Sequence, residues 1–307
     1  EVQPAEHLSL KYSFPKWIVE HWLSWLGLDE TLSLCRALNE PPEMHIRINT
    51  LKVFRSEVEA HFKEQGISFT SGNFVPEVLK VSPGHLVVAD PWLAEGKYYV
   101  QDESSALAAH ALQVKPGQVV YDLCSAPGGK ATHLAQLMEN RGSILAFDVS
   151  SQRLEKVKAN AKRLGTTIIE ARQGDATEDL ELTPADRVIV DAPCSGLGTM
   201  RHRPDIRWRK SLEEVQELVS IQKKILNRAA NYVKPGGILL YTTCTLTKWE
   251  NEAVARWFLE NHPHFSPHVL PEWFPRNSEE PNWQQTLLPH RHNVDGFFLA
   301  IFRKQQF

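Results

Sequence analysis

The chain has 307 residues, of which 42% are hydrophobic, and its formal net charge is -3 at pH 7. This length allows one large domain with one or two smaller ones, and the charge argues against a wholly basic surface while leaving local basic patches open. No apolar run of 18 residues and no basic-then-apolar leader is visible, so neither a membrane span nor export is indicated.

The four cysteines are widely spaced, and no two of them form a C-x-x-C pair; they are Cys35, Cys124, Cys194 and Cys244. The spacing therefore signals neither a zinc site nor a disulfide framework. Free cysteines of this kind are typical of a reducing compartment, so we expect a cytoplasmic protein.

Residues 1–40 are expected to form a helical segment. Apolar residues recur there at helical spacing, namely Ile18, Trp22, Trp25 and Leu26. Gly27 supplies a helix end, and the tryptophans are expected in the core. Pro41-Pro42 then stops the pattern.

The sequence pattern of residues 41–95 predicts a small α+β module. The expected order is a strand from Met44 to Lys52, a helix from Ser56 to Gln65 ended by Gly66, and strands near 67–70 and 78–81. Alternation within the first strand puts Arg47, Asn49 and Leu51 on one face. A solvated strand face is the simplest interpretation of that pattern.

From residue 96 to 307, strands alternate with helices, which predicts a mostly parallel sheet covered on both faces. The expected strands are Val119–Leu123, Ser143–Val149, Thr167–Ala171, Arg187–Val190 and Gly237–Thr243, with helices near 130–139, 151–164 and 211–233 and a last hairpin that includes Gly296–Arg303. Such sheets bind ligands at the carboxyl ends of their strands. Asp122, Asp148, Asp191 and Cys244 each close a strand, so one site at this edge is predicted.

The first strand is followed by a Pro-Gly-Gly loop and a helix, where glycines let the backbone approach a ligand closely. The candidate cofactor residues of this loop are Cys124, Ser125, Ala126, Pro127, Gly128, Gly129 and Lys130. The loop lacks both phosphate-binding glycine spacings, so a donor without phosphates, such as S-adenosylmethionine, fits better. Asp148 is placed to accept hydrogen bonds from the ribose hydroxyls, and Asp175 is placed to contact the adenine ring.

Two later segments carry cysteines at the same predicted edge. Asp191-Ala192-Pro193-Cys194-Ser195-Gly196 is a turn after an apolar strand, and Thr242-Thr243-Cys244-Thr245 ends the next one. A thiolate that adds to carbon 6 of cytosine makes carbon 5 nucleophilic, and a carboxylate at protonated N3 assists that addition. Asp191, Cys194 and Cys244 suit this chemistry, although spacing leaves open which cysteine attacks.

A basic segment follows the Pro-Cys turn. Residues 201–210 contain five Lys or Arg side chains against one Asp, with Trp208 available for stacking. A solvated loop is the alternative interpretation. We expect RNA contacts here, and also from the small module if it packs beside the cleft; the candidates are Arg47, Lys52, Arg201, Arg203, Arg207, Arg209 and Lys210.

These motifs, together with Tyr12-Ser13-x-Pro15, Arg47-x-Asn49-Thr50-Leu51-Lys52 and Asp295-Gly296-Phe297-Phe298, resemble the bacterial Sun/Fmu (RsmB-type) RNA cytosine-5 methyltransferases over nearly the whole chain. The resemblance implies an α/β fold: a Rossmann-like methyltransferase sheet, a small RRM-like RNA-binding module and an N-terminal helical segment. It implies S-adenosylmethionine at Cys124–Lys130, Asp148, Asp175 and Asp191, and 16S ribosomal RNA as substrate. It also makes Cys244 the nucleophile and gives Cys194 a role in product release.

Members of that family usually carry a helical, NusB-like domain before the matched region, and this chain begins at Glu1 without one, so we expect a truncated protein. The alternatives are the same chemistry on tRNA or DNA, a non-catalytic ribosome-assembly protein, and a small-molecule methyltransferase. His290, Arg291 and His292 lack a third ligand nearby, so no metal is expected. No membrane partner is expected either, because the chain has no long apolar run.

Overall fold

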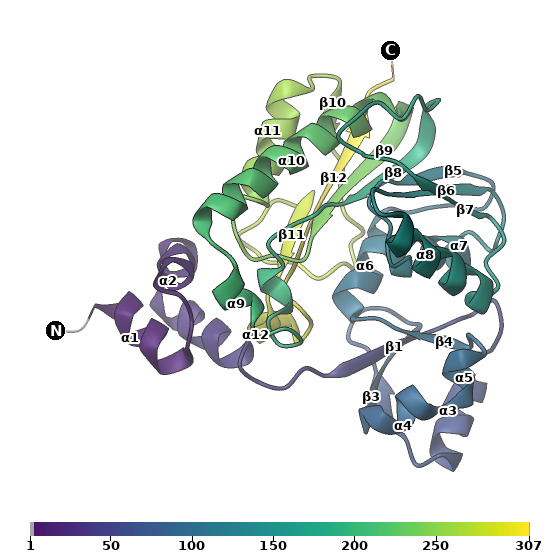
Figure 1. Ribbon diagram of the computed structural model, residues 1–307, viewed down its shortest axis with the longest axis horizontal. Helices are drawn as coiled ribbons and strands as arrows, with labels where there is room; N and C mark the ends of the chain where they lie inside the picture. Colours follow the sequence, from purple (N-terminus) through teal and green to yellow (C-terminus); the bar gives the residue numbers. More distant parts are fainter. Residues whose placement is uncertain (1–2, 307) are drawn as a thin grey trace.

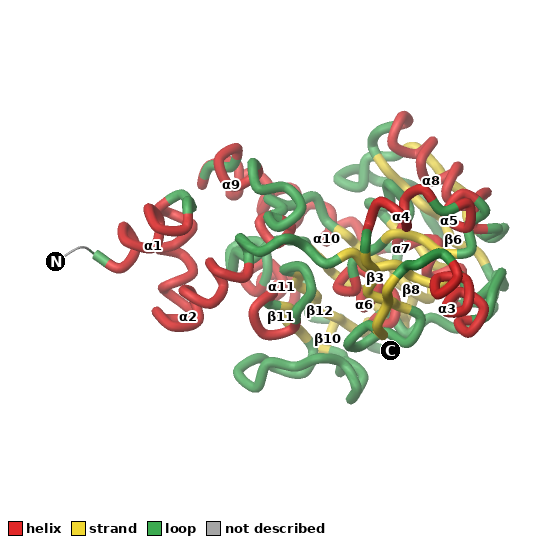
Figure 2. The backbone as a smooth tube through the Cα atoms, turned by 90° about the horizontal axis from the view of Figure 1, so that it is seen from below, coloured by secondary structure: helices red, strands yellow, loops and turns green. Residues whose placement is uncertain are grey.

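The computed structural model describes residues 3–306 and contains two β-sheets and a pair of N-terminal helices. In Figure 1 the N-terminal helices lie at the left, the large sheet at the upper right and the small sheet below it. Figure 2 shows the N-terminal helices and the small module at opposite ends of the molecule. No helix within residues 3–306 is long and apolar enough to cross a membrane.

Two helices form the N-terminal segment, α1 (Pro4–Tyr12) and α2 (Lys16–Ala37). Gly27 breaks the helical backbone of α2 with a φ of 77°, and the chain then resumes a helical course. This left-handed conformation favours glycine, which is why the predicted helix end falls at this residue. Trp22 is fully buried, as expected, whereas Trp25 is only partly buried.

The N-terminal helices share a hydrophobic core with the loops of the large domain. Leu197, Met200 and Leu246 belong to the same buried cluster as Trp22. The Trp22 indole Nε1 also donates a hydrogen bond to the Leu246 carbonyl oxygen at 3.2 Å. The helices therefore support the segments that follow the two predicted active-site cysteines.

The small module is a four-stranded antiparallel sheet with helices between its strands. Its elements are β1 (Met44–Ile48), α3 (Arg55–Glu64), β2 (Ser68–Ser71), β3 (Val78–Ser82), α4 (Gly84–Ala89), α5 (Pro91–Ala94) and β4 (Tyr98–Val100). The strand order β2-β3-β1-β4 is that of a split βαβ arrangement. β4 lies beyond residue 95, in the segment that sequence patterns assigned to the large domain.

The large sheet has eight strands, ordered β10-β12-β9-β8-β5-β6-β7 with β11 paired to β12. The strands are β5 (Val119–Asp122), β6 (Ser143–Asp148), β7 (Ile169–Gln173), β8 (Ala185–Asp191), β9 (Val233–Thr243), β10 (Phe265–Pro267), β11 (Gln284–Leu287) and β12 (Phe297–Lys304). β5 to β9 pair in parallel, whereas β12 runs antiparallel to β9, β10 and β11. The expected mostly parallel sheet and terminal hairpin are confirmed.

Helices cover both faces of this sheet (Figure 1). One face packs against α6 (Glu103–Ala111), α7 (Gly129–Leu137) and α8 (Ser151–Leu164), and the other against α10 (Leu212–Asn231) and α11 (Glu252–Asn261). Short helical segments occur at η1 (Leu197–Thr199), α9 (Ile206–Arg209) and α12 (Pro289–His292). Alternate residues of β5 divide between the two cores, Val120 to one and Tyr121 to the other, which is why these strands are apolar on both faces.

The strand order places a ligand site at the carboxyl ends of β5 and β8. From β5 the chain passes to β6 and β7 on one side, and it then returns to β8 on the other side. Loops leaving β5 and β8 therefore diverge, and this divergence opens a crevice where ligands bind in doubly wound sheets.

Candidate active site

The loop from β5 to α7 is held in a fixed shape by its neighbours. Gly128 has a φ of 96°, and a Cβ built on it would stand 3.2 Å from the Cα of Val157 on α8. The Ser125 amide donates to the Phe147 carbonyl oxygen at 2.7 Å, and the Gly128 amide donates to that of Ser125 at 2.7 Å. Glycine is favoured at residue 128 because a side chain there would strain the left-handed backbone and crowd Val157 of α8.

Aspartates at the strand ends differ in their surroundings. Asp148, at the end of β6, accepts from the Ser150 amide at 3.0 Å and lies 3.3 Å from Arg153 Nη1. Asp175 is exposed and accepts from the amide and hydroxyl of Thr177 at 2.9 and 2.7 Å. Burial and the nearby charge of Asp191 raise the pKa of Asp122 to about 7.

The two cysteines after β8 and β9 lie side by side. Their Sγ atoms are 3.3 Å apart, although the residues are 50 positions apart in the chain. Parallel pairing sets Asp191 opposite Thr242, so the segments that follow leave the sheet at the same edge. The Gly198 amide then donates to the Cys244 carbonyl oxygen at 2.9 Å, which ties the two loops together.

Lys130 and Asp191 form an ion pair beside these cysteines. Lys130 Nζ is 2.7 Å from Asp191 Oδ2, and the Thr242 hydroxyl donates to Asp191 Oδ1 at 2.9 Å. A hydrogen bond from Cys194 and the charge of Lys130 lower the pKa of Cys244. The same hydrogen bond and burial raise the pKa of Cys194. The two shifts are in opposite directions, and the charge of Lys130 favours the ionised form of Cys244.

Glu250 fixes both cysteine loops, and no sequence pattern had singled it out. Its buried carboxylate accepts from the Ser195 amide at 2.7 Å, from the Gln222 amide nitrogen at 3.1 Å and from the Thr247 hydroxyl at 2.7 Å. Ser195 follows Cys194 and Thr247 lies three residues after Cys244, so one side chain holds both segments. Only three-dimensional proximity identifies this role.

A cleft of about 880 Å³ opens over these residues. It is lined by eight of the predicted catalytic and cofactor-binding residues, namely Cys124, Ala126, Lys130, Asp148, Asp175, Asp191, Cys194 and Cys244. Ser125, Pro127, Gly128 and Gly129 shape the loop behind this surface rather than lining it.

The C-terminal strand completes the cleft from the opposite side. Asp295, Gly296 and Phe297 line it, together with His202, whose Nε2 lies 3.1 Å from Asp295 Oδ2. Gly296 and Gly198 are pressed together: the Gly296 amide donates to the Gly198 carbonyl oxygen at 3.0 Å, and a Cβ on Gly296 would stand 2.7 Å from the Gly198 Cα. Sequence reasoning had given His202 no role.

Two of the predicted RNA contacts, Arg47 and Arg207, are buried inside the protein and not on its surface. Arg47 is 1% exposed and donates to Gln101 Oε1, the Gly129 carbonyl oxygen and Thr132 Oγ1 at 2.6, 2.8 and 3.1 Å. It therefore joins the small module to α7, and the solvated strand face is absent. Arg207 is 5% exposed and lies 4.0 Å over the Phe14 ring.

The other predicted RNA contacts lie nearer the surface. Lys52 Nζ donates to the carbonyl oxygens of Glu95 and Arg163, both at 2.7 Å, and Arg201 donates to that of Pro41 at 2.8 Å. Arg203 is exposed and lines the cleft, whereas Lys210 is half-buried. Exposed Arg209 pairs with Asp205 at 3.0 Å.

Two protein-family models match this chain. Residues 109–303 match the family model described as 16S rRNA methyltransferase RsmB/F, and residues 14–87 match the RsmF/B-like ferredoxin-like domain.

The chain belongs to the RsmB/F methyltransferase family. It is 36% identical to the probable ribosomal RNA small subunit methyltransferase B of Bacillus subtilis, over 98% of this chain and 69% of that protein. The resemblance predicted from the sequence is confirmed. The predicted folds are also confirmed, namely the Rossmann-like fold of the large domain and the α+β fold of the small module. As a member of this family, the protein is an S-adenosylmethionine-dependent RNA methyltransferase.

Solved structures extend the comparison. The crystal structure of PH0851 aligns with a TM-score of 0.92 and 40% identity, over 99% of this chain and 70% of that one. The structure of NSun6 from Pyrococcus horikoshii with SFG aligns with a TM-score of 0.87 and 25% identity, over 96% of this chain and all of that one.

Proposed function

We propose that this RsmB/F-family protein methylates carbon 5 of a cytosine in 16S ribosomal RNA through a covalent adduct on Cys244. The observation that carries the proposal is the pair of sulfur atoms 3.3 Å apart in one cleft, beside the Lys130–Asp191 ion pair. A methyltransferase that acts on a more reactive atom needs no such pair of thiols.

The cleft residues fit S-adenosylmethionine. The left-handed turn at Gly128 leads into the N-terminus of α7, which suits a carboxylate, and Asp148 offers a hydrogen-bond acceptor at the end of β6. Bound there, S-adenosylmethionine supplies the methyl group. The residues that would hold it are Cys124, Ser125, Ala126, Pro127, Gly128, Gly129, Lys130, Asp148, Asp175 and Asp191.

Cys244 performs the attack in this proposal. Its thiolate forms a bond to carbon 6 of the target base, and the electron pair of the 5,6 double bond becomes available at carbon 5. Asp191 stabilises the ring by accepting a hydrogen bond from protonated N3. Lys130 both lowers the pKa of Cys244 and holds Asp191 in place.

Cys194 assists the release of product. After carbon 5 has taken the methyl group and given up its proton to a base in the cleft, the carbon 6–sulfur bond breaks and Cys244 leaves as a thiolate. Cys194 is protonated and adjacent, so its S–H group can donate a hydrogen bond to that departing thiolate. A cytosine must leave its stack to enter the cleft, so a flipped or single-stranded base is the expected target.

Replacement of Cys244 by Ala removes the attacking sulfur and should abolish methyl transfer to small-subunit rRNA. Transfer of tritiated methyl groups to 16S rRNA measures this effect. Cys35→Ala is the matched control, because Cys35 is buried in α2 away from the cleft and should retain activity. Full activity of C244A would contradict the nucleophile assignment.

Replacement of Cys194 by Ala should instead trap the protein on its RNA, because methylation proceeds while release is slowed. A denaturing gel would show a slower-migrating protein–RNA band that disappears in the double variant C194A/C244A. A C194A enzyme that turns over normally and shows no such band would remove the release role.

Bisulfite sequencing identifies the substrate in a strain from which the gene has been deleted. The expected result is one cytosine of 16S rRNA that loses its methyl mark and regains it on complementation. Loss of a mark in tRNA would redirect the proposal to the alternative substrate, and no lost mark would favour a non-catalytic assembly role. An rRNA substrate also implies a cytoplasmic location.

A further inference from the structure

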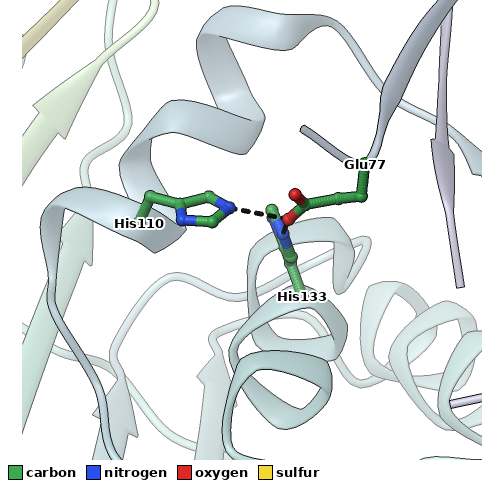
Figure 3. A group of neighbouring side chains, drawn as sticks. All are labelled: Glu77, His110 and His133. Carbon is green, nitrogen blue, oxygen red and sulfur yellow. Dashed lines mark hydrogen bonds and ion pairs between the residues drawn. The ribbon is translucent and has the colours of Figure 1, made fainter. Parts of the chain in front are cut away.

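Three side chains from three separate elements meet on the side of α7 that faces the small module. Glu77 precedes β3 in the small module, His110 lies on α6, and His133 lies on α7. Figure 3 shows that both histidine rings point at the same end of the Glu77 carboxylate. None of the three lines the catalytic cleft, so the proposed reaction does not use them.

We propose that Glu77, His110 and His133 form a binding site for a divalent transition-metal ion of the zinc class, joining the small module to the large domain. No sequence motif indicates this site, because the three residues are 33 and 23 positions apart and match no metal-ligand spacing.

The donor atoms already converge. Each histidine Nε2 lies 2.6 Å from Oε1 of Glu77, and the three donor atoms are all within 4.8 Å of one another. The two rings stand at 76° with their centroids 5.2 Å apart, and the Nε2 atoms of both rings contact the same carboxylate oxygen. A bound ion would take the place of the two Nε2 hydrogens, and the single proton of each neutral imidazole would move from Nε2 to Nδ1.

The required movement is small. In a tetrahedral zinc site with bonds of about 2.0–2.1 Å, neighbouring ligand atoms stand about 3.3 Å apart. Each nitrogen–oxygen separation would therefore widen from 2.6 Å by roughly 0.7 Å, a shift that side-chain rotation supplies.

Burial and hydrogen bonding favour the metal-binding forms of two of the side chains, His133 and Glu77. His133 is fully buried, and burial together with the charge of Arg47 lowers its pKa to about 3, so its ring is neutral at physiological pH. Burial opposes ionisation of Glu77, yet the hydrogen bonds from both histidines hold its pKa well below the usual range. Neutral imidazoles and an ionised carboxylate are the ligand forms of these residues.

The donor set selects the metal. Two imidazole nitrogens and one carboxylate oxygen favour Zn²⁺, Co²⁺ or Ni²⁺ over the oxygen-seeking ions Ca²⁺ and Mg²⁺. The His110 side chain is 20% exposed, which gives an ion and a fourth, water ligand a route to the site. Within residues 3–306, His133 Nδ1 has no hydrogen-bond partner, and a missing outer partner costs about 10–100-fold in affinity. We therefore expect micromolar rather than nanomolar binding.

The location determines what the ion would do. Glu77 belongs to the small module, whereas His110 and His133 belong to helices of the large domain, so one ion would cross-link the two parts. α7 also carries the cofactor loop at its start. Metal binding should therefore stabilise the fold without entering the chemistry.

The test is a Co²⁺ titration of the chelator-treated, tag-free full chain. The expected result is one equivalent of Co²⁺ with the visible absorption of a nitrogen–oxygen site and no thiolate charge-transfer band. The thermal unfolding midpoint should rise with Co²⁺ or Zn²⁺ concentration, because the ion binds the folded state. Absence of saturable binding up to millimolar Co²⁺ would overturn the proposal.

Variants locate the ion. H133Q and H110Q should each weaken Co²⁺ binding at least tenfold; H110Q serves if the buried H133Q fails to fold. Two controls should bind Co²⁺ as the parent does: C194S/C244S, which lacks the cleft thiols, and H202Q, which disrupts the other cluster of potential ligands, formed by Asp102, His202 and Asp295. Binding that survives in H110Q, or is lost in either control, would place the ion elsewhere.

Discussion

Two basic side chains at the start of α7, Lys130 and Arg47, differ in their surroundings. Lys130 faces the cleft, where it pairs with Asp191 and acts on the charge of Cys244. Arg47 reaches the start of α7 from the small module, is 1% exposed and has protein acceptors at Gln101, Gly129 and Thr132. Lys130 is available to the proposed reaction, whereas the guanidinium of Arg47 is engaged in hydrogen bonds that hold the loop.

This difference shows that the partners of a cation decide its role. A lysine paired with one carboxylate in an open cleft still affects every titrating group near it. An arginine with three acceptors in a buried junction is a structural residue, because any other use would leave those groups unsatisfied. The two positions should therefore respond to mutation in different measurements.

Replacement of Lys130 by Ala should give the larger effect on activity. Loss of the charge raises the pKa of Cys244, so the thiolate fraction at pH 7 falls, and Asp191 loses its partner. We expect kcat/KM at pH 7 to fall by about 100-fold or more, with the deficit shrinking as pH rises. A pH–rate profile of methyl transfer measures both the fall in kcat/KM at pH 7 and the change of that deficit with pH.

Lys130→Arg is the matched control, since it keeps the charge and should leave the acid limb of the profile close to that of the parent. An acid limb in K130A that coincides with the parent's would show that Lys130 does not tune Cys244.

Replacement of Arg47 by Leu should cost stability instead. The change leaves three acceptors without their donor in a buried junction, and we expect a loss of about 3 kcal/mol in the free energy of unfolding. Urea unfolding monitored by tryptophan fluorescence measures it. Lys63→Ala, an exposed change on α3 of the same module, should be nearly neutral. If R47L weakened RNA binding at unchanged stability, Arg47 would belong with the surface cations after all.

The smallest effects are expected at the exposed arginines. Arg203→Ala and Arg209→Ala should each weaken RNA binding a few-fold and reduce the salt dependence of log K by about 0.7, the loss of one phosphate contact on a single strand. Filter binding at several salt concentrations measures the slope. Arg141→Ala, an exposed change after α7, should alter neither the RNA affinity nor its salt dependence. Unchanged slopes for R203A and R209A would remove them from the RNA surface.

Much of the site could be predicted from sequence because parallel strands all present their carboxyl ends at one edge. Asp122, Asp148, Asp191 and Cys244 each follow an apolar strand, so their convergence follows from fold class alone. The meeting of Cys194 with Cys244 needed only one further fact, that β8 and β9 are neighbours.

What remained hidden depends on packing between distant segments. Alternation in β1 correctly put Arg47 on one face, but it could not say that another domain covers that face. β1 also ends earlier than predicted, at Ile48, because the Asn49 side chain accepts from the Leu51 amide and turns the chain. The α6 helix lacks a strong apolar stripe, and its alanines pack in the core all the same. The role of Glu250 could not be predicted either, because it depends on contacts between segments that are distant in the sequence.

The contact between Gly198 and Gly296 has a consequence for the order of events in the cell. The loop that carries Cys194 is seated against the start of β12, some 100 residues further along the chain, and Asp295, Gly296 and Phe297 form one wall of the cleft. A ribosome that is still translating this message has made both cysteines long before it makes that wall. The nascent polypeptide therefore carries both cysteines before the cleft can close, and the wall of the cleft is in place only when β12 has emerged and paired with β9.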